Sequence, residues 1–245
     1  MPVETLLKAW ASDPAIQLDA VVDGWILPAQ PAAIFAAGKQ AHVPVIVGSN
    51  LDEATIFGGR GKVTTVAQFK EAVADQAGKY ADTMLAAYPI ATDADVPARY
   101  LELMTDSFGY GAQSLAQTVS RSGSRAYFYC FSYADIGTRA ALGAHHGLEM
   151  NFLAGEFPND FTRTPDAATL GETMRRYWVQ FAKTGNPNAA GLPEWIAYDP
   201  GDDRCLDLGR TIAPRAVPHG AALAAWSETM RRVFEETGVT RIGSR

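Results

Sequence analysis

Basic clusters and long apolar runs are both missing from this sequence of 245 residues. The formal net charge is −6, and no segment gathers the Lys and Arg side chains that neutralise nucleic-acid phosphates. The apolar runs, such as residues 126–131, are far shorter than the roughly 20 residues that cross a bilayer. The sequence therefore disfavours a nucleic-acid partner and predicts no membrane span.

Cysteine is scarce, and the first residues lack the features of a leader. Cys130 and Cys205 are too few for a disulfide framework, so we expect two buried thiols rather than a bridge. The opening MPVETLLKAW has no basic start, no uninterrupted apolar stretch and no cleavage site, so it is not a secretory signal. The compartment stays open between cytoplasm and secretion. The use of Ala, Asp and Arg with few Lys is compatible with a high-GC bacterium.

Apolar residues make up 47% of the chain, enough for a core, and their spacing predicts alternating strands and helices. Short apolar runs predict strands at 42–50, 125–133 and 204–208. Helical spacing and end signals predict several helices. One starts after the capping box of Thr65 and Gln68, a second lies around 80–88, and a third runs from residue 95 onward with a break at Gly109 and Gly111. Two more are expected from Pro165 to Gly185 and over residues 221–236.

Strands separated by long helices predict an α/β fold with a mostly parallel sheet. About three strands for this much helix is fewer than the usual four to six. The chain therefore looks like one part of a larger fold.

Three segments carry a resemblance to a known family. Residues 21–57 contain an Asp-Gly-x-x-Leu-Pro phrase, a strand and then an Asn-x-Asp-Glu turn, and residues 143–155 contain a His-Gly-x-Glu phrase. Residues 177–200 contain a helix and turn followed by a Trp-x-x-Tyr phrase. In this order, the three segments resemble the type-B carboxylesterases, the family of the cholinesterases and the bacterial para-nitrobenzyl esterases.

The resemblance implies the C-terminal portion of an α/β-hydrolase fold over residues 1–245, with the N-terminal half absent. It implies that Glu53 is the acid and His146 the histidine of a Ser-Glu-His triad, and that Phe57 lines the substrate gorge. The acid-before-histidine order is that of α/β-hydrolases. His145 is assigned to local packing or solvent, because adjacent side chains point in different directions. Glu149 is expected to fix the loop rather than to react.

The nucleophile is the main departure from the family pattern. No Gly-x-Ser-x-Gly elbow occurs, and Ser107, Ser114, Ser122 and Ser124 all lack the flanking glycines. The family's serine and oxyanion loop precede the triad acid, so we expect them before Met1. The isolated chain is therefore predicted to be inactive, and its sheet to have an exposed, partly apolar edge.

Two other features of the sequence, a glycine-rich phrase and the remaining histidines, do not indicate a binding site. The phrase GGRGK at 58–62 lacks the first glycine and the final Ser or Thr of a phosphate loop, which indicates an ordinary loop. His42 and His219 are isolated in sequence, so no metal site and no cofactor are expected.

The sequence thus predicts part of a serine carboxylesterase that acts on carboxylic esters, with its missing N-terminal half as partner. Two alternatives stay open: a non-catalytic esterase-like interaction module, and a self-sufficient hydrolase that uses one of its own serines.

Overall fold

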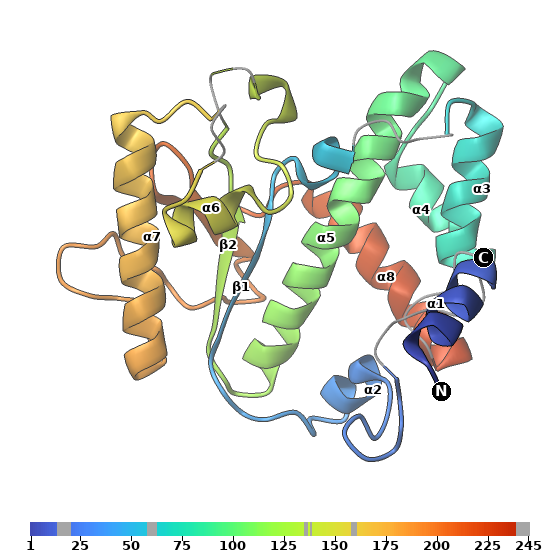
Figure 1. The fold of residues 1–245 in the computed structure, drawn as a ribbon, viewed down its shortest axis with the longest axis horizontal. Helices are drawn as coiled ribbons and strands as arrows, with labels where there is room; N and C mark the ends of the chain where they lie inside the picture. Colours follow the sequence, from blue (N-terminus) through green and yellow to red (C-terminus); the bar gives the residue numbers. More distant parts are fainter. Residues whose placement is uncertain (14–20, 58–62, 135–136, 138, 158–160, 239–245) are drawn as a thin grey trace.

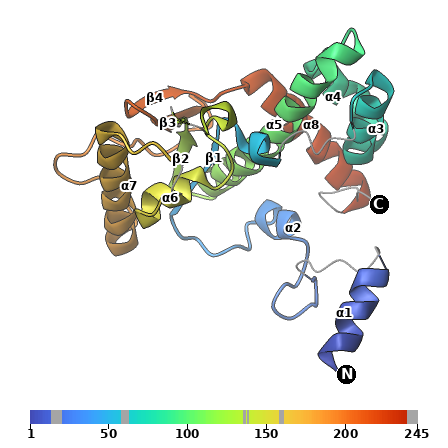
Figure 2. The same ribbon diagram turned by 45° about the horizontal axis from the view of Figure 1, so that its top comes forward.

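A computed structural model describes residues 1–13, 21–57, 63–134, 137, 139–157 and 161–238. Its centre is a four-stranded sheet in the order β1-β2-β3-β4 (Figures 1 and 2). The strands are β1 (Val45–Asn50), β2 (Ala126–Phe131), β3 (Arg204–Leu208) and β4 (Ala213–Ala216). The pairs β1–β2 and β2–β3 are parallel, and β3–β4 is antiparallel. This is the mostly parallel α/β layer that the sequence predicts.

The helices of the described residues have the following bounds: α1 (Val3–Ser12), α2 (Pro31–Ala36), α3 (Val66–Ala77), α4 (Ala81–Ala87), α5 (Val96–Arg121), α6 (Leu148–Ala154), α7 (Pro165–Thr184) and α8 (Gly220–Thr237). The predicted end signals are confirmed. Thr65 and Gln68 form a capping box before α3, Thr164 caps α7, and Gly185 ends α7 with a φ of 70°. No described helix is long and apolar enough to span a bilayer.

Strand β2 is buried on both faces, which explains its nearly continuous aromatic run. Tyr127 and Phe131 pack into the cluster on the side of α6 and α7. Phe128 and Cys130 point the opposite way, into the cluster formed with α5 and α8. A parallel strand covered by helices on both sides needs this kind of sequence.

Helix α5 runs unbroken for 26 residues, so the predicted break at Gly109 and Gly111 is wrong. A Cβ on Gly109 would make an ordinary van der Waals contact of 3.4 Å with the Leu223 side chain, so α5 packs against α8 at this position without a break. Burial of both ends of α5 outweighs a glycine cost of about 1 kcal/mol each.

Two further expectations are corrected. The short strand β4 escaped prediction because Pro214 argues against a strand, although proline is tolerated in an edge strand such as this one. Cys130 and Cys205 form a disulfide between the neighbouring strands β2 and β3, with their Cα atoms 5.9 Å apart. Both residues are buried, as expected, but the preference for two thiols over a bridge is wrong. The phrase at 58–62 lies outside the described residues.

Strand β1 forms one edge of the sheet, and among the described residues no strand pairs with its outer side. Val45, Ile46 and Val47 on this strand are only partly buried. Helix α1 stands away from the sheet in Figure 2 and buries none of its residues. The predicted open, partly apolar edge is therefore present.

Candidate active site

The site forms where β1 and β2 end. The two strands run parallel with Asn50 opposite Phe131, so the loops that follow them leave from the same edge of the sheet. These loops continue to pair: the Asp52 N–H donates to the Ala144 carbonyl at 3.1 Å, and the His146 N–H donates to the Glu53 carbonyl at 3.4 Å. Backbone pairing thus places Glu53 beside His146.

The Glu53 and His146 side chains are in direct contact. His146 Nδ1 lies 2.6 Å from Glu53 Oε2, although 93 residues separate them in sequence. Glu53 is 5% exposed, and its other oxygen accepts the Asn50 backbone N–H at 2.9 Å. Half of the His146 side chain is exposed. The predicted contact is confirmed, while the catalytic roles of the two residues stay predictions.

Electrostatics at the pair combine two opposing effects. Burial raises the pKa of the Glu53 carboxyl above its usual value, and the hydrogen bonds from the Asn50 N–H and from His146 pull it down. A carboxylate that accepts the Nδ1 hydrogen fixes one tautomer of the ring, so the lone pair of the neutral imidazole is on Nε2. The arrangement therefore suits a general base that acts through Nε2.

His145 has a packing role, as predicted. The residue is 4% exposed, its Nδ1 lies 3.0 Å from the His146 carbonyl, and its Nε2 lies 3.2 Å from an Arg139 guanidinium nitrogen. Both ring nitrogens are thus engaged away from Glu53. His145 does not compete for the carboxylate.

Asn50 and Asp52 hold the two loops together, and sequence reasoning missed both roles. Asn50 Nδ2 donates to the His145 carbonyl at 2.8 Å and to Glu149 Oε2. Asp52 Oδ2 accepts the Ala144 N–H at 2.8 Å. The signal was available, because both residues belong to the same Asn-x-Asp-Glu turn as Glu53. The contact of Glu149 with Asn50 agrees with the loop-fixing role expected for it.

Two aromatic rings flank His146. The Phe57 ring lies 5.5 Å and the Phe108 ring 5.1 Å from the imidazole, centroid to centroid. Phe57 was singled out by the family resemblance, whereas Phe108 comes from α5 and was missed. Apolar walls beside a histidine suit an apolar substrate group. The substrate role of Phe57 stays a prediction.

The serines that the sequence analysis considered do not complete a triad here. Ser107 and Ser114 lie within α5, and the hydroxyl of Ser107 donates to the Met104 carbonyl. The hydroxyl of Ser122 donates to the Val119 carbonyl at the end of the same helix. Within the part of the chain that the structure describes, no serine hydroxyl is hydrogen-bonded to His146.

The fold of this chain is similar to that of two solved structures. The chain aligns with a carboxylesterase of Geobacillus stearothermophilus with a TM-score of 0.73 and 25% identity, over 92% of this chain and 49% of the other. It aligns with EstA of Aspergillus niger with a TM-score of 0.70 and 22% identity, over 90% of this chain and 46% of the other. The fold is therefore about half of an α/β-hydrolase.

The amino-acid sequence shows which family the chain belongs to. The carboxylesterase family model matches residues 2–226, and the chain belongs to that family. Liver carboxylesterase of Sus scrofa is 30% identical over 88% of this chain and 41% of its own length. Fumonisin B1 esterase of Sphingopyxis macrogoltabida is 30% identical over 73% of this chain and 35% of its own length. The chain thus spans about two fifths of the curated relatives that it matches.

Proposed function

We propose that residues 1–245 are the C-terminal part of a serine carboxylesterase domain and supply the acid and the base of its Ser-Glu-His triad. The nucleophilic serine and the oxyanion donors come from outside these residues. The contact of 2.6 Å between Glu53 and His146, in a chain of the carboxylesterase family, carries the proposal. No cofactor is needed for this chemistry.

The proposed reaction hydrolyses a carboxylic ester in two steps. His146 Nε2 takes the proton of the serine hydroxyl as its oxygen attacks the ester carbonyl, and then gives that proton to the departing alcohol. Water, deprotonated by the same nitrogen, cleaves the acyl-enzyme and releases the acid. Glu53 orients the ring and stabilises the imidazolium. Phe57 contributes an apolar wall to the pocket that receives the substrate.

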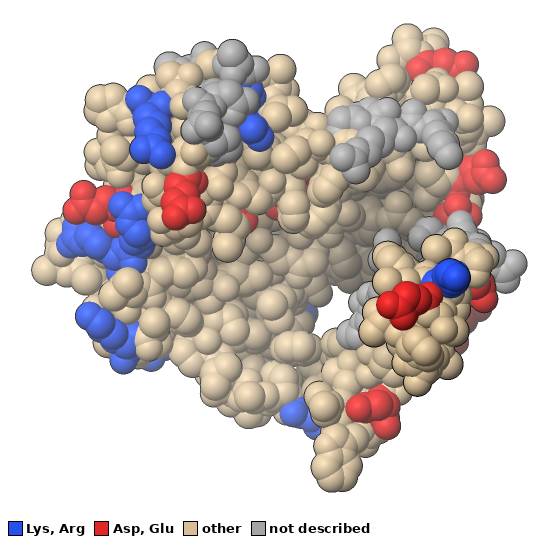
Figure 3. Space-filling view, viewed as in Figure 1, with Lys and Arg blue, Asp and Glu red and all other residues tan. Residues whose placement is uncertain are grey.

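The missing half is the proposed partner, and the open edge of β1 is where it would pair. Parallel sheets are normally covered on both faces and paired within the sheet. The face in Figure 3 supports this, because few charged side chains lie over its middle, where Figure 1 places β1, β2 and α5. A charge-poor face beside an unpaired strand edge suits a protein partner.

The test is to sequence the DNA upstream of the Met1 codon and to co-express the polypeptide that it encodes with this chain. We expect a Gly-x-Ser-x-Gly segment there, no turnover of short-chain nitrophenyl esters by the purified chain alone, and organophosphate-sensitive turnover by the complex. His42→Ala is the control for His146→Ala, since His42 is exposed and lies apart from the site.

Three outcomes would count against the proposal. Upstream DNA without a serine elbow would remove the source of the nucleophile. Turnover by the chain alone that is lost on mutation of one of its own serines would favour the self-sufficient hydrolase. A stable complex that has no activity, with or without His146, would favour the non-catalytic interaction module.

A further inference from the structure

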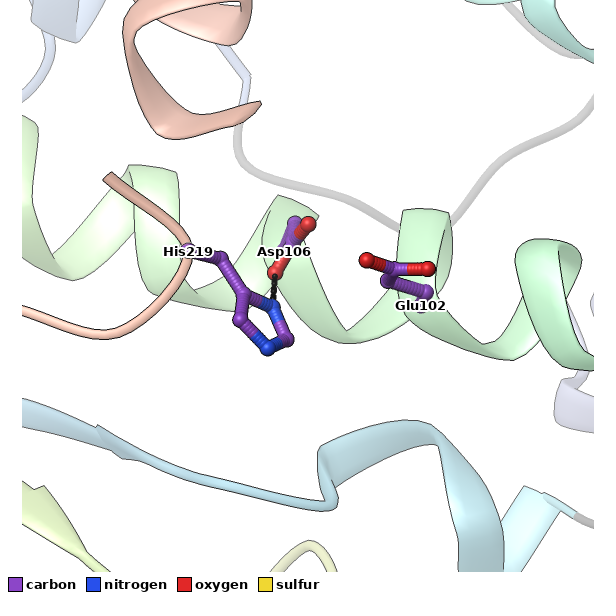
Figure 4. A group of neighbouring side chains, drawn as sticks. All are labelled: Glu102, Asp106 and His219. Atoms are coloured by element: carbon purple, nitrogen blue, oxygen red, sulfur yellow. Dashed lines mark hydrogen bonds and ion pairs between the residues drawn. The ribbon is translucent and has the colours of Figure 1, made fainter. Parts of the chain in front are cut away.

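A second histidine meets carboxylates at the junction of α5 and α8. Glu102 and Asp106 lie one turn apart on α5, and His219 is the residue just before α8. Their potential ligand atoms all lie within 4.8 Å of one another. Figure 4 shows the two carboxylates side by side on one face of α5, with the imidazole reaching in from the segment before α8.

The centre of this cluster is held by the core. Asp106 is 3% exposed, and its two oxygens accept hydrogen bonds of 2.7 Å from His219 Nδ1 and from the Tyr88 hydroxyl. Tyr88 in turn accepts the indole N–H of Trp226 at 2.9 Å. Asp106 is therefore fixed from the inside by side chains of two other segments.

The outer side of the cluster is open to solvent. The Glu102 side chain is 29% exposed, and the His219 side chain is 46% exposed. Glu102 contacts Arg99 one turn earlier on the same helix. Ion pairs at this spacing near the surface contribute little, so Glu102 can exchange Arg99 for another cation.

We propose that Glu102, Asp106 and His219 bind a divalent first-row transition-metal cation, with Zn²⁺ as the best match. One imidazole nitrogen and two carboxylate oxygens are donors that Zn²⁺ accepts, and three protein ligands leave a position for water. Mg²⁺ and Ca²⁺ favour sites with more oxygen ligands. The cation replaces the hydrogen that His219 Nδ1 shares with Asp106, and that hydrogen passes to Nε2 or to solvent.

The test is Zn²⁺ titration of the purified, chelator-stripped chain, with calorimetry and competition against a chromophoric chelator. We expect one Zn²⁺ per chain and a higher melting temperature when Zn²⁺ is bound. His219→Gln and Glu102→Gln should each weaken binding by roughly tenfold or more, because each removes a ligand. The matched controls His42→Gln and Glu71→Gln change exposed residues elsewhere and should leave the affinity unchanged.

His146→Gln separates this site from the Glu53–His146 pair. Zn²⁺ affinity that is unchanged in His146→Gln supports the α5–α8 site, whereas loss of binding in this variant places the metal at the other pair and overturns the proposal. No Zn²⁺ binding by a chain with a native-like circular dichroism spectrum would also overturn it. Equal affinity in wild type, Glu102→Gln and His219→Gln would do the same.

Discussion

The molecule contains two histidine–carboxylate pairs with nearly the same internal geometry and different surroundings. The distance from Nδ1 to the carboxylate is 2.6 Å for His146 with Glu53 and 2.7 Å for His219 with Asp106. In both pairs the carboxylate is buried and about half of the histidine side chain is exposed. The contact between the two groups therefore does not by itself define what a pair does.

The two pairs differ in the residues that surround each histidine. His146 lies in the loop after β2 and is flanked by two aromatic rings, Phe57 from the segment after β1 and Phe108 from α5. His219 lies between two helices, and a second carboxylate, that of Glu102, stands nearby. Apolar walls around a base favour proton transfer to and from an organic substrate, whereas a further anion favours a cation. What surrounds each pair is thus the basis for the function proposed for it.

The largest expected effect separates the two histidines. In the complex with the serine-bearing half, His146→Ala should lower ester turnover by roughly 10⁴ to 10⁶-fold, because the serine loses its base. His219→Ala should leave turnover within about threefold, since no proton transfer depends on it. Initial rates with a nitrophenyl ester measure both. A comparable loss in the two variants would erase the distinction drawn between the pairs.

The carboxylates of the two pairs should also differ: a change at Glu53 should affect turnover, and a change at Asp106 should affect stability. Glu53→Gln should lower turnover by about 10³ to 10⁴-fold, since an amide cannot stabilise the imidazolium. Asp106→Asn should instead lower the free energy of unfolding by about 1–3 kcal/mol, because the carboxylate joins Tyr88 and His219 inside the protein. Ester turnover and urea denaturation of each variant test this. Unchanged turnover in Glu53→Gln would remove the acid role from this residue.

A third prediction tests how the loops hold the first pair. A Cβ on Gly143 would lie 2.2 Å from Asp52 Oδ2, and the φ of Gly143 is 59°. Gly143→Ala should therefore displace the loop that carries His146, with a loss of about 10²-fold in turnover. Gly147→Ala is the matched control, because its φ is 78° but no atom lies within 4 Å of the added Cβ. Similar losses in both variants would mean that backbone strain, rather than the Asp52 contact, is responsible.

The contact at the first pair could be predicted because it depends on local sequence and one rule of topology. Glu53 and His146 each follow a recognisable strand, and parallel strands bring the loops after them to one edge. Phe108 escaped prediction because it reaches the site from the middle of α5, and only the packing of that helix on β1 and β2 sets its position. A side chain brought in by a crossing helix leaves no local pattern to recognise.

The pair of Asp106 and His219 could not be predicted from the sequence, for the same reason. Asp106 and His219 are 113 residues apart, and the crossing of α5 and α8 alone brings them together. The bridge between Cys130 and Cys205 likewise required that β2 and β3 be known as neighbours. Helix ends, in contrast, depend on one or two local residues, and the cap at Thr65 was predicted correctly.

The smallest expected effect is a pH dependence of stability that belongs to the second pair. The hydrogen bond to Asp106 raises the pKa of His219 above 6.5, helped by the charges of Asp106 and Glu102 and opposed by burial and by Arg215. The protonated pair therefore stabilises the fold fully below the unfolded-state pKa, and this stabilisation is lost as pH rises through the folded-state pKa.

The measurement is the free energy of unfolding of wild type and His219→Gln as a function of pH, from below the unfolded-state pKa of His219 to above its folded-state pKa. A chelator is present so that no metal contributes. The difference between the two proteins should be largest near pH 5.5 and should shrink as pH rises above neutrality, since only wild type carries the titrating ring. Packing lost in the variant adds an offset that does not vary with pH, so the slope alone carries the test. A His219→Gln difference that stays constant, or grows toward high pH, would mean that the ring does not hold its proton against Asp106.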